Sequence, residues 1–299
     1  FVAYSPLGRG FLTGNISADT SFDAGDFRTN AGIESSYLQT ALPPSVALHW
    51  NAEWTHGAFI MPTDASSRES LARTGRNLRQ SLGLPSDIHR ECAPGFEGMF
   101  DELVFGAIWS RPGLELHDRM VAVVASLAAL ERESMLREYA RAAVAAGVSA
   151  SGVREIVLQA GLYTGFVSAE TNLAVVNEML GTPVQTDAAA AGPAPDADLL
   201  EAGIAVMEDI HGERARAGYA SGDGAPADLY DLAIRYGYGL LWNRPGLDRR
   251  ARLIVSVAVF ATLEQHTQLV KFSTSAMSGG LSFEAIKEVL MQIAPYCGF

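Results

Sequence analysis

Trp109-Ser110-Arg111-Pro112-Gly113-Leu114 recurs further along the chain as Trp242-Asn243-Arg244-Pro245-Gly246-Leu247. From these hexapeptides the two copies run without a gap to Tyr163-Thr164-Gly165-Phe166 and to Tyr296-Cys297-Gly298-Phe299. About 20 positions are identical, and a repeat of this length marks a duplicated structural unit. A residue that matters in one copy can therefore be looked for in the other.

Each copy has the pattern of consecutive α-helices. Met120–Leu130 and Leu253–Leu263 are too long and too alanine-rich for strands, and are typical of buried helices. An amphipathic stretch follows each segment and ends in a glycine, Gly147 or Gly280, as helices commonly do. Because residues 68–299 contain no convincing strand, the sequence predicts an all-α protein with two similar helical domains.

Further helices are expected on either side of this repeat. Ser149 and Ser282 stand at N-cap positions of the next helix in each copy. The remaining predicted helices cover 70–82, 95–109, 169–180, 199–213 and 227–242. Copy two stops at Phe299, where copy one continues to Leu180, so the second domain is expected to be incomplete.

The order of these motifs resembles the carboxymuconolactone decarboxylase family, the helical relatives of the alkylhydroperoxidase D proteins. The resemblance implies a compact helical fold that forms homo-oligomers, and tandem members use one copy against the other in place of separate subunits. The matching residues are Trp109, Arg111, Pro112, Gly113, Leu114, Arg119, Glu155, Gln159, Tyr163, Gly165 and Phe166, with Trp242, Arg244, Pro245, Gly246, Leu247, Arg252, Glu288, Gln292, Tyr296, Gly298 and Phe299 in copy two.

The resemblance implies two chemistries. The peroxidase type needs a Cys-x-x-Cys pair with a low thiol pKa. The corresponding positions hold Arg132 and Met135, then Gln265 and Gln268, so peroxidase function is excluded. The decarboxylase type usually places a histidine where this chain has Tyr139 and Phe272. Phenylalanine cannot deliver a proton to the carbanion left by CO₂, and Tyr139 could do so only with a strongly depressed pKa.

Five residues are the candidate catalytic groups. Arg119 and Arg252 could clamp a substrate carboxylate, the alternative being an ion pair with Glu155 or Glu288. Glu131 and Glu264 could act as general acid or base if they are buried, the alternative being solvated carboxylates at a helix end. Tyr139 is the fifth candidate.

The remaining polar candidates have plainer readings. Tyr163 and Tyr296 either line a pocket or pack in the core with satisfied hydroxyls. The histidines at 117 and 266 have no counterpart in the other copy and are expected to be solvated, and His56, His89 and His211 lack metal-ligand spacing.

The N-terminal stretch differs from the repeats. Phe1–Gly14, with its Ser-Pro-Leu-Gly-Arg-Gly turn, and Asp26–Asn30 resemble the C-terminal part of an aldo-keto reductase. That family's catalytic set lies upstream of this stretch, and a single strand cannot close an eight-stranded barrel, so we expect no nucleotide binding. The predicted parts are a reductase-like fragment (1–30), an unassigned segment (31–67), domain one (68–181), a linker (182–198) and domain two (199–299).

Composition limits the classes of function. The net charge of −12 argues against nucleic-acid or anionic-membrane surfaces. The longest apolar run is far shorter than the roughly 20 residues of a membrane span. The two cysteines, Cys92 and Cys297, are isolated and form no disulfide framework or cysteine metal site. We therefore expect a cytoplasmic protein with a small-molecule carboxylate substrate and no cofactor, metal, nucleic-acid or membrane partner.

Three functions remain open from the sequence. The first is a cofactor-free carbon–carbon lyase that decarboxylates a small carboxylated lactone or ring acid. The second is a catalytically silent helical domain for oligomerisation or binding. The third is a fragment of an aldo-keto reductase fused to a decarboxylase-like domain.

Overall fold

The computed structural model describes residues 65–85, 93–181, 198–213, 215 and 225–299. The described residues form helices and no strands, which confirms the predicted all-α fold. The reductase-like fragment 1–30, nearly all of the segment 31–67 and the linker 182–197 lie outside the described residues.

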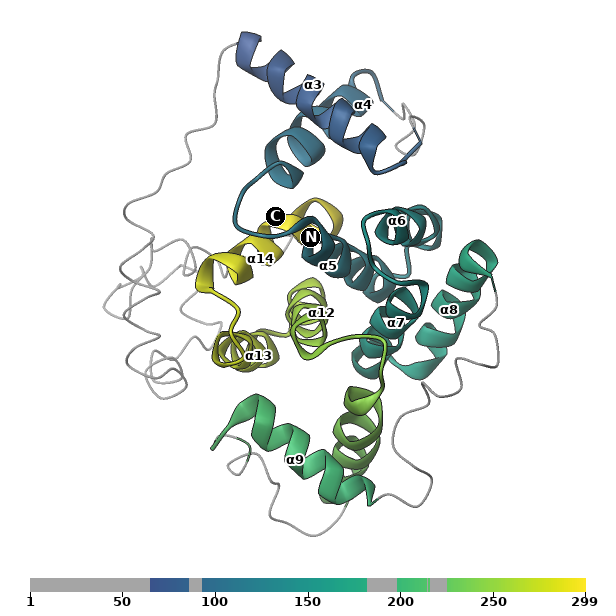
Figure 1. Ribbon diagram of the computed structural model, residues 1–299, viewed down its shortest axis with the longest axis vertical. Coiled ribbons are helices and arrows are strands. Elements are labelled where there is room, and N and C mark those ends of the chain that lie inside the picture. Colours follow the sequence, from purple (N-terminus) through teal and green to yellow (C-terminus); the bar gives the residue numbers. More distant parts are fainter. Residues whose placement is uncertain (1–64, 86–92, 182–197, 214, 216–224) are drawn as a thin grey trace, which may run out of the picture. The chain divides into compact units, whose positions relative to one another are not determined.

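The helices follow the same order in both halves of the chain (Figure 1). The first half forms α3 (Ala65–Ser81), α4 (Phe96–Met99), η3 (Phe100–Trp109), α5 (Leu116–Ala129), α6 (Glu133–Ala145), α7 (Ala150–Thr164) and α8 (Phe166–Leu180). The second forms α9 (Leu199–His211), α11 (Ala225–Leu232), η5 (Ala233–Leu240), η6 (Leu241–Asn243), α12 (Arg249–Thr262), α13 (His266–Ser278) and α14 (Phe283–Cys297).

The predicted helix boundaries have the expected local causes. The Ser149 hydroxyl accepts from the Gly152 backbone N–H and caps α7, and Ser282 caps α14 by accepting from Ala285. Gly147 and Gly280 have φ values of 97° and 95°, which other residues rarely adopt.

Helices α5 and α12 form the centre of the core. Almost every residue of both is buried, as their continuous apolar sequences predicted. Asp118 pairs with Arg250 where the helices begin, and the hydroxyls of Ser126 and Thr262 meet where they end. The two helices therefore lie side by side in the same direction, and one hydrophobic core extends through both copies.

Two helix pairs, α3 with η3 and α9 with η5, cross at very close range. A Cβ atom on Gly75 would lie 1.9 Å from the carbonyl oxygen of Asp101, and one on Gly203 would lie 2.3 Å from that of Ile234. Gly106 and Gly239 face the partner backbone in the same way. Glycine is thus required at these crossings.

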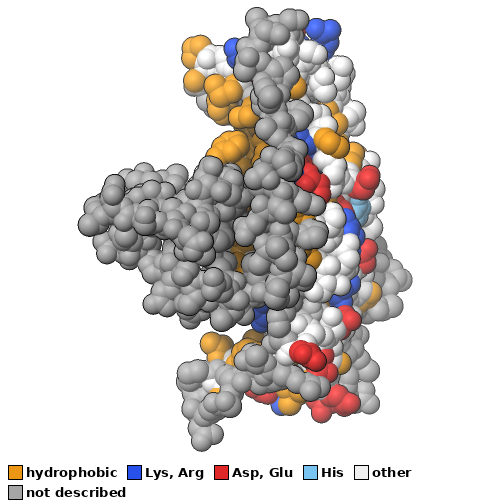
Figure 2. All heavy atoms as spheres, turned by 90° about the vertical axis from the view of Figure 1, so that its left-hand side faces the viewer, with side chains coloured by type: hydrophobic (Ala, Val, Ile, Leu, Met, Phe, Trp, Pro, Cys, Tyr) orange, Lys and Arg blue, Asp and Glu red, His pale blue; other side chains and the backbone are white. Residues whose placement is uncertain are grey.

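Residues Ala65–Cys297 form one compact unit that contains the helices of both copies. None of its described helices is long and apolar enough to cross a bilayer. On the face shown in Figure 2, acidic and basic side chains of the described residues are interspersed.

Candidate functional site

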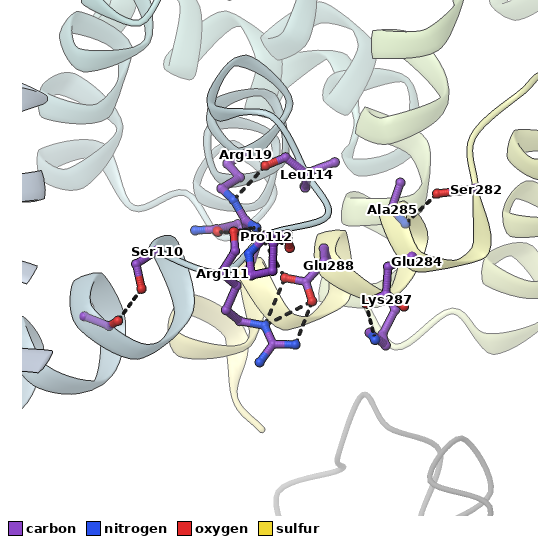
Figure 3. A network of polar contacts seen from close by, with 12 residues as sticks. Ser110, Arg111, Pro112, Leu114, Arg119, Ser282, Glu284, Ala285, Lys287 and Glu288 are labelled. Atoms are coloured by element: carbon purple, nitrogen blue, oxygen red, sulfur yellow. Dashed lines mark hydrogen bonds and ion pairs between the residues drawn. The ribbon is translucent and has the colours of Figure 1, made fainter. Parts of the chain in front are cut away.

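A buried network of polar side chains joins the two copies. Arg119 on α5 donates from Nη1 to Gln292 Oε1 (2.8 Å) and from Nη2 to Glu288 Oε2 (3.3 Å), both on α14. Arg111, in the turn before α5, holds the same carboxylate with Nη2 at 2.7 Å. Figure 3 shows both guanidinium groups turned toward Glu288.

The equivalent network contains the equivalent residues with the copies exchanged. Arg252 on α12 donates to Gln159 Oε1 (2.9 Å) and Glu155 Oε2 (3.0 Å), both on α7. Arg244 pairs with Glu155 at 2.8 Å. Each copy thus supplies the arginines that pair with the glutamate of the other copy. The sequence repeat alone did not show whether these pairs form within a copy or between copies.

These contacts show which groups the two candidate arginines bind. Arg119 is 1% exposed, and its Nε, Nη1 and Nη2 atoms all donate within the protein. Burial lowers the pKa of both Arg119 and Arg252, against the opposing effect of the paired carboxylates. Of the two readings from the sequence, the ion pair is the arrangement found, with Glu288 for Arg119 and Glu155 for Arg252.

Glu131 and Glu264 occupy equivalent turns after α5 and α12. Both are exposed, and their φ values of 54° and 56° are unusual for residues other than glycine. The burial required for a general acid or base is not met, and their environment is that of solvated carboxylates.

Tyr139 belongs to a buried aromatic cluster with hydroxyl groups at its centre. Trp109 Nε1 donates to the Tyr296 hydroxyl (2.9 Å), which lies 2.8 Å from the Tyr139 hydroxyl. Burial raises the pKa of Tyr139 and of Tyr296. The depressed pKa that a proton-donating Tyr139 needs is therefore absent, and both phenols stay neutral hydrogen-bond donors.

The hydrogen-bond donors in this cluster outnumber the acceptors. Of the Tyr139 and Tyr296 protons, one lies between the two hydroxyls, and the other has no acceptor among the described residues. Gln292 is fully buried, its oxygen accepts from Arg119, and its Nε2 has no partner among those residues. We call Trp109, Tyr139, Gln292 and Tyr296 site one; it lacks an acceptor such as an anionic oxygen.

The equivalent cluster in the other half is internally satisfied. Gln159 Nε2 donates to the Tyr163 hydroxyl (2.9 Å), which lies 2.7 Å from Ser256 Oγ. Ser256 Oγ in turn donates to the Arg252 carbonyl at 3.0 Å. We call Gln159, Tyr163, Trp242 and Ser256 site two.

The comparisons with known proteins agree with this helical repeat. The model of the carboxymuconolactone decarboxylase family matches residues 94–178 and 227–299, which is more than half of the chain. The chain belongs to the carboxymuconolactone decarboxylase family. Both matched segments include the tryptophan, arginine, glutamate, glutamine and tyrosine of the two networks, so the networks lie in the family's own part of the chain.

Two decarboxylases are similar to this chain. A 4-carboxymuconolactone decarboxylase from Acinetobacter baylyi is 30% identical over 104 residues, 35% of this chain and 75% of its own. A nitrosuccinic acid decarboxylase from Metarhizium robertsii is 26% identical over 101 residues, 33% of this chain and 71% of its own. These likenesses support a decarboxylase-like function at the level of the family.

The sequence did not reveal that His211 is buried beside site two, where its ring contacts those of Tyr238 and Phe272. It is buried at the end of α9, with Nδ1 2.7 Å from Ser275 Oγ and Nε2 2.9 Å from the Tyr238 hydroxyl. Its ring meets that of Phe272 edge-on at 5.1 Å. The helical spacing of Met207, Ile210 and His211 was the available signal for its burial.

Neither a reactive cysteine nor a metal site is found among the described residues. Burial raises the pKa of the Cys297 thiol to about 11, so it is no thiolate nucleophile. Among the described residues, no group of three histidine, cysteine or acidic side chains is placed to hold a metal ion.

Proposed function

We propose that this chain is a cofactor-free decarboxylase of a small carboxylated lactone or similar acid, and that site one stabilises the anion formed as CO₂ leaves. The observation that carries the proposal is the pair of buried donors without acceptors, the phenolic O–H of the Tyr139–Tyr296 pair and Gln292 Nε2. A buried donor is costly unless an acceptor arrives, and a substrate oxygen supplies one.

The chemistry requires little more than this arrangement. When the bond to the carboxylate breaks, CO₂ departs and the electron pair moves onto a conjugated carbonyl oxygen of the substrate. Preorganised donors in a water-poor site stabilise that oxygen more in the transition state than in the ground state. One proton from water is then taken up at the carbon that lost CO₂, so that carboxylate and proton together give CO₂ and the protonated product. Neutral tyrosines with raised pKa suit the role, because they donate without ionising.

Arg119 and Arg252 are assigned a positioning role in this proposal. Arg119 holds the oxygen of the Gln292 amide, so the amide nitrogen faces away from the guanidinium. Arg252 holds Gln159 in the same way, and there the freed nitrogen donates to Tyr163. Glu131 and Glu264 receive no role.

The experiment is CO₂ release from 4-carboxymuconolactone and from nitrosuccinate by the whole chain. Tyr296→Phe removes the central hydroxyl of site one and is expected to lower kcat about 100-fold, the usual effect of losing one anion-stabilising donor. Tyr139→Phe, which leaves the Tyr296 O–H in place, should cost less. The matched control is Tyr163→Phe in site two. Equal loss in Tyr163→Phe and Tyr296→Phe would contradict the assignment to site one.

The competing function is a catalytically silent helical domain for oligomerisation or binding. It is favoured by the fully internal use of Arg119 and by Phe272 at the position where decarboxylases of this type usually carry histidine. Absence of CO₂ release from a range of activated carboxylates, with a folded protein, would favour this reading.

A further inference from the structure

We propose that Ser256 closes site two, so that the chain holds one anion-binding site although it contains two copies of the fold. The inference rests on the anion-binding role proposed above for site one. It concerns two clusters built largely from equivalent residues that differ at two positions: Ser256 stands where copy one has Val123, and Phe272 stands where copy one has Tyr139.

The direction of the hydrogen bonds in site two follows from its last member. Ser256 Oγ lies 3.0 Å from the Arg252 carbonyl oxygen, which can only accept, so the serine proton is committed there. The 2.7 Å contact between Ser256 and Tyr163 must then be a bond in which tyrosine donates. Tyr163 in turn accepts from Gln159 Nε2.

The amide nitrogen, the phenol and the serine hydroxyl of site two therefore each already donate one hydrogen bond. These three groups form one continuous chain ending on the backbone. The one unpartnered side-chain atom of this network is Arg252 Nε, whose counterpart Arg119 Nε donates to the Leu114 carbonyl. That atom belongs to the contact between arginine and the preceding turn, outside the hydroxyl chain.

Site one lacks the element that closes this chain. Val123 is apolar and fully buried, so it offers no acceptor to the hydroxyls of Tyr139 and Tyr296. Gln292 Nε2, the counterpart of the Gln159 nitrogen, is left without a partner among the described residues. Site one therefore keeps two donors that an anionic oxygen could accept from, Gln292 Nε2 and one hydroxyl of the Tyr139–Tyr296 pair. In site two the same oxygen would have to displace the Ser256 hydroxyl and would leave that hydrogen-bond chain broken.

Equilibrium dialysis against labelled succinate, a small dicarboxylate probe, tests the inference. The measured quantity is the number of moles of succinate bound per mole of chain at saturation. The wild type is expected to bind one equivalent. Val123→Ser copies the closing residue into site one and should abolish binding. Ser256→Val combined with Phe272→Tyr converts site two into a copy of site one and should raise binding to two equivalents.

The outcomes separate this inference from the proposed function. Two equivalents on the wild type, or one equivalent retained by Val123→Ser, would overturn the closure by Ser256 and leave the decarboxylase proposal standing. No binding to the wild type, together with no CO₂ release, would overturn both. The Val123→Ser variant keeps the test decisive if the double variant does not fold, and circular dichroism checks the fold of each.

Discussion

At the scale of single residues, two hydroxyls distinguish clusters that are otherwise close copies: Ser256 replaces Val123, and Tyr139 replaces Phe272. Tyr163 and Tyr296 occupy equivalent positions, and Tyr296 accepts a hydrogen bond from Trp109 of the other copy. The Tyr163 hydroxyl donates a hydrogen bond to Ser256 Oγ. Of the Tyr139 and Tyr296 hydroxyl protons, one lies between the two oxygens and the other has no acceptor among the described residues. The hydrogen-bond partners around a tyrosine, more than the presence of the tyrosine, thus decide whether its hydroxyl can donate to a ligand.

The titration of Tyr163 gives a pH-dependent prediction. Burial raises its pKa from 10.0 to about 12, so the folded protein keeps a proton that the unfolded chain releases. Its contribution to the free energy of unfolding is intact below pH 10 and is lost as the pH rises toward about 12. We expect a loss of at most about 2 kcal/mol, since the side chain keeps partial exposure.

Urea unfolding of wild type and Tyr163→Phe, measured at about pH 9 and about pH 12, checks this contribution. The wild type should lose more stability between the two pH values than the variant does. An identical loss in both proteins would show that Tyr163 titrates like an exposed tyrosine.

At the scale of helices, the close crossings depend on backbone contact. Gly75→Ala would place a methyl group 1.9 Å from the Asp101 carbonyl oxygen, which cannot rotate away as a side chain can. We expect the helix pair α3 and η3 to separate and the protein to lose about 3 kcal/mol or more.

Gly98→Ala is the matched control, because nothing lies within 4 Å of the added methyl group. Alanine is the better helix former, so this variant should be as stable as the wild type or gain up to about 1 kcal/mol. Thermal melts of both variants decide the matter, and equal midpoints would mean that α3 is free to shift.

The helices themselves were readable from the sequence, but their partners were not. Hydrophobic periodicity, Ser149 and Gly147 fix local structure, and the repeat extends each assignment to the other copy. Whether Arg119 meets Glu155 or Glu288 is a question about packing between distant segments, which periodicity does not contain. The closure of site two that we propose for Ser256 was hidden for a related reason, because it depends on the hydrogen bonds from Gln159 through Tyr163 and Ser256 to the Arg252 carbonyl.

At the scale of the whole molecule, the two copies form one folding unit. The core extends through α5 and α12, and both buried ion-pair networks cross between copies. Breaking such a network by removing one partner typically costs about 3–5 kcal/mol. We therefore expect neither half to keep its fold without the other.

Cutting the chain between residues 182 and 197 tests this unity. With a protease site introduced there, the two cleaved pieces should remain together in gel filtration and should separate only in denaturant. Pieces that elute separately under native conditions, each still helical by circular dichroism, would contradict a shared core.

The exchanged ion pairs have a consequence for how such a duplicated chain can change over time. Arg119 depends on a carboxylate 169 positions away, in the other half of the molecule. A substitution of either partner leaves an unpaired buried charge in the opposite half. We therefore expect substitutions to be tolerated only when both members of a pair change together, Arg119 with Glu288 or Arg252 with Glu155. Positions such as Val123 and Ser256 carry no such obligation. The duplication therefore left the two halves joined by these ion pairs, while the hydrogen bonding inside the two copies came to differ.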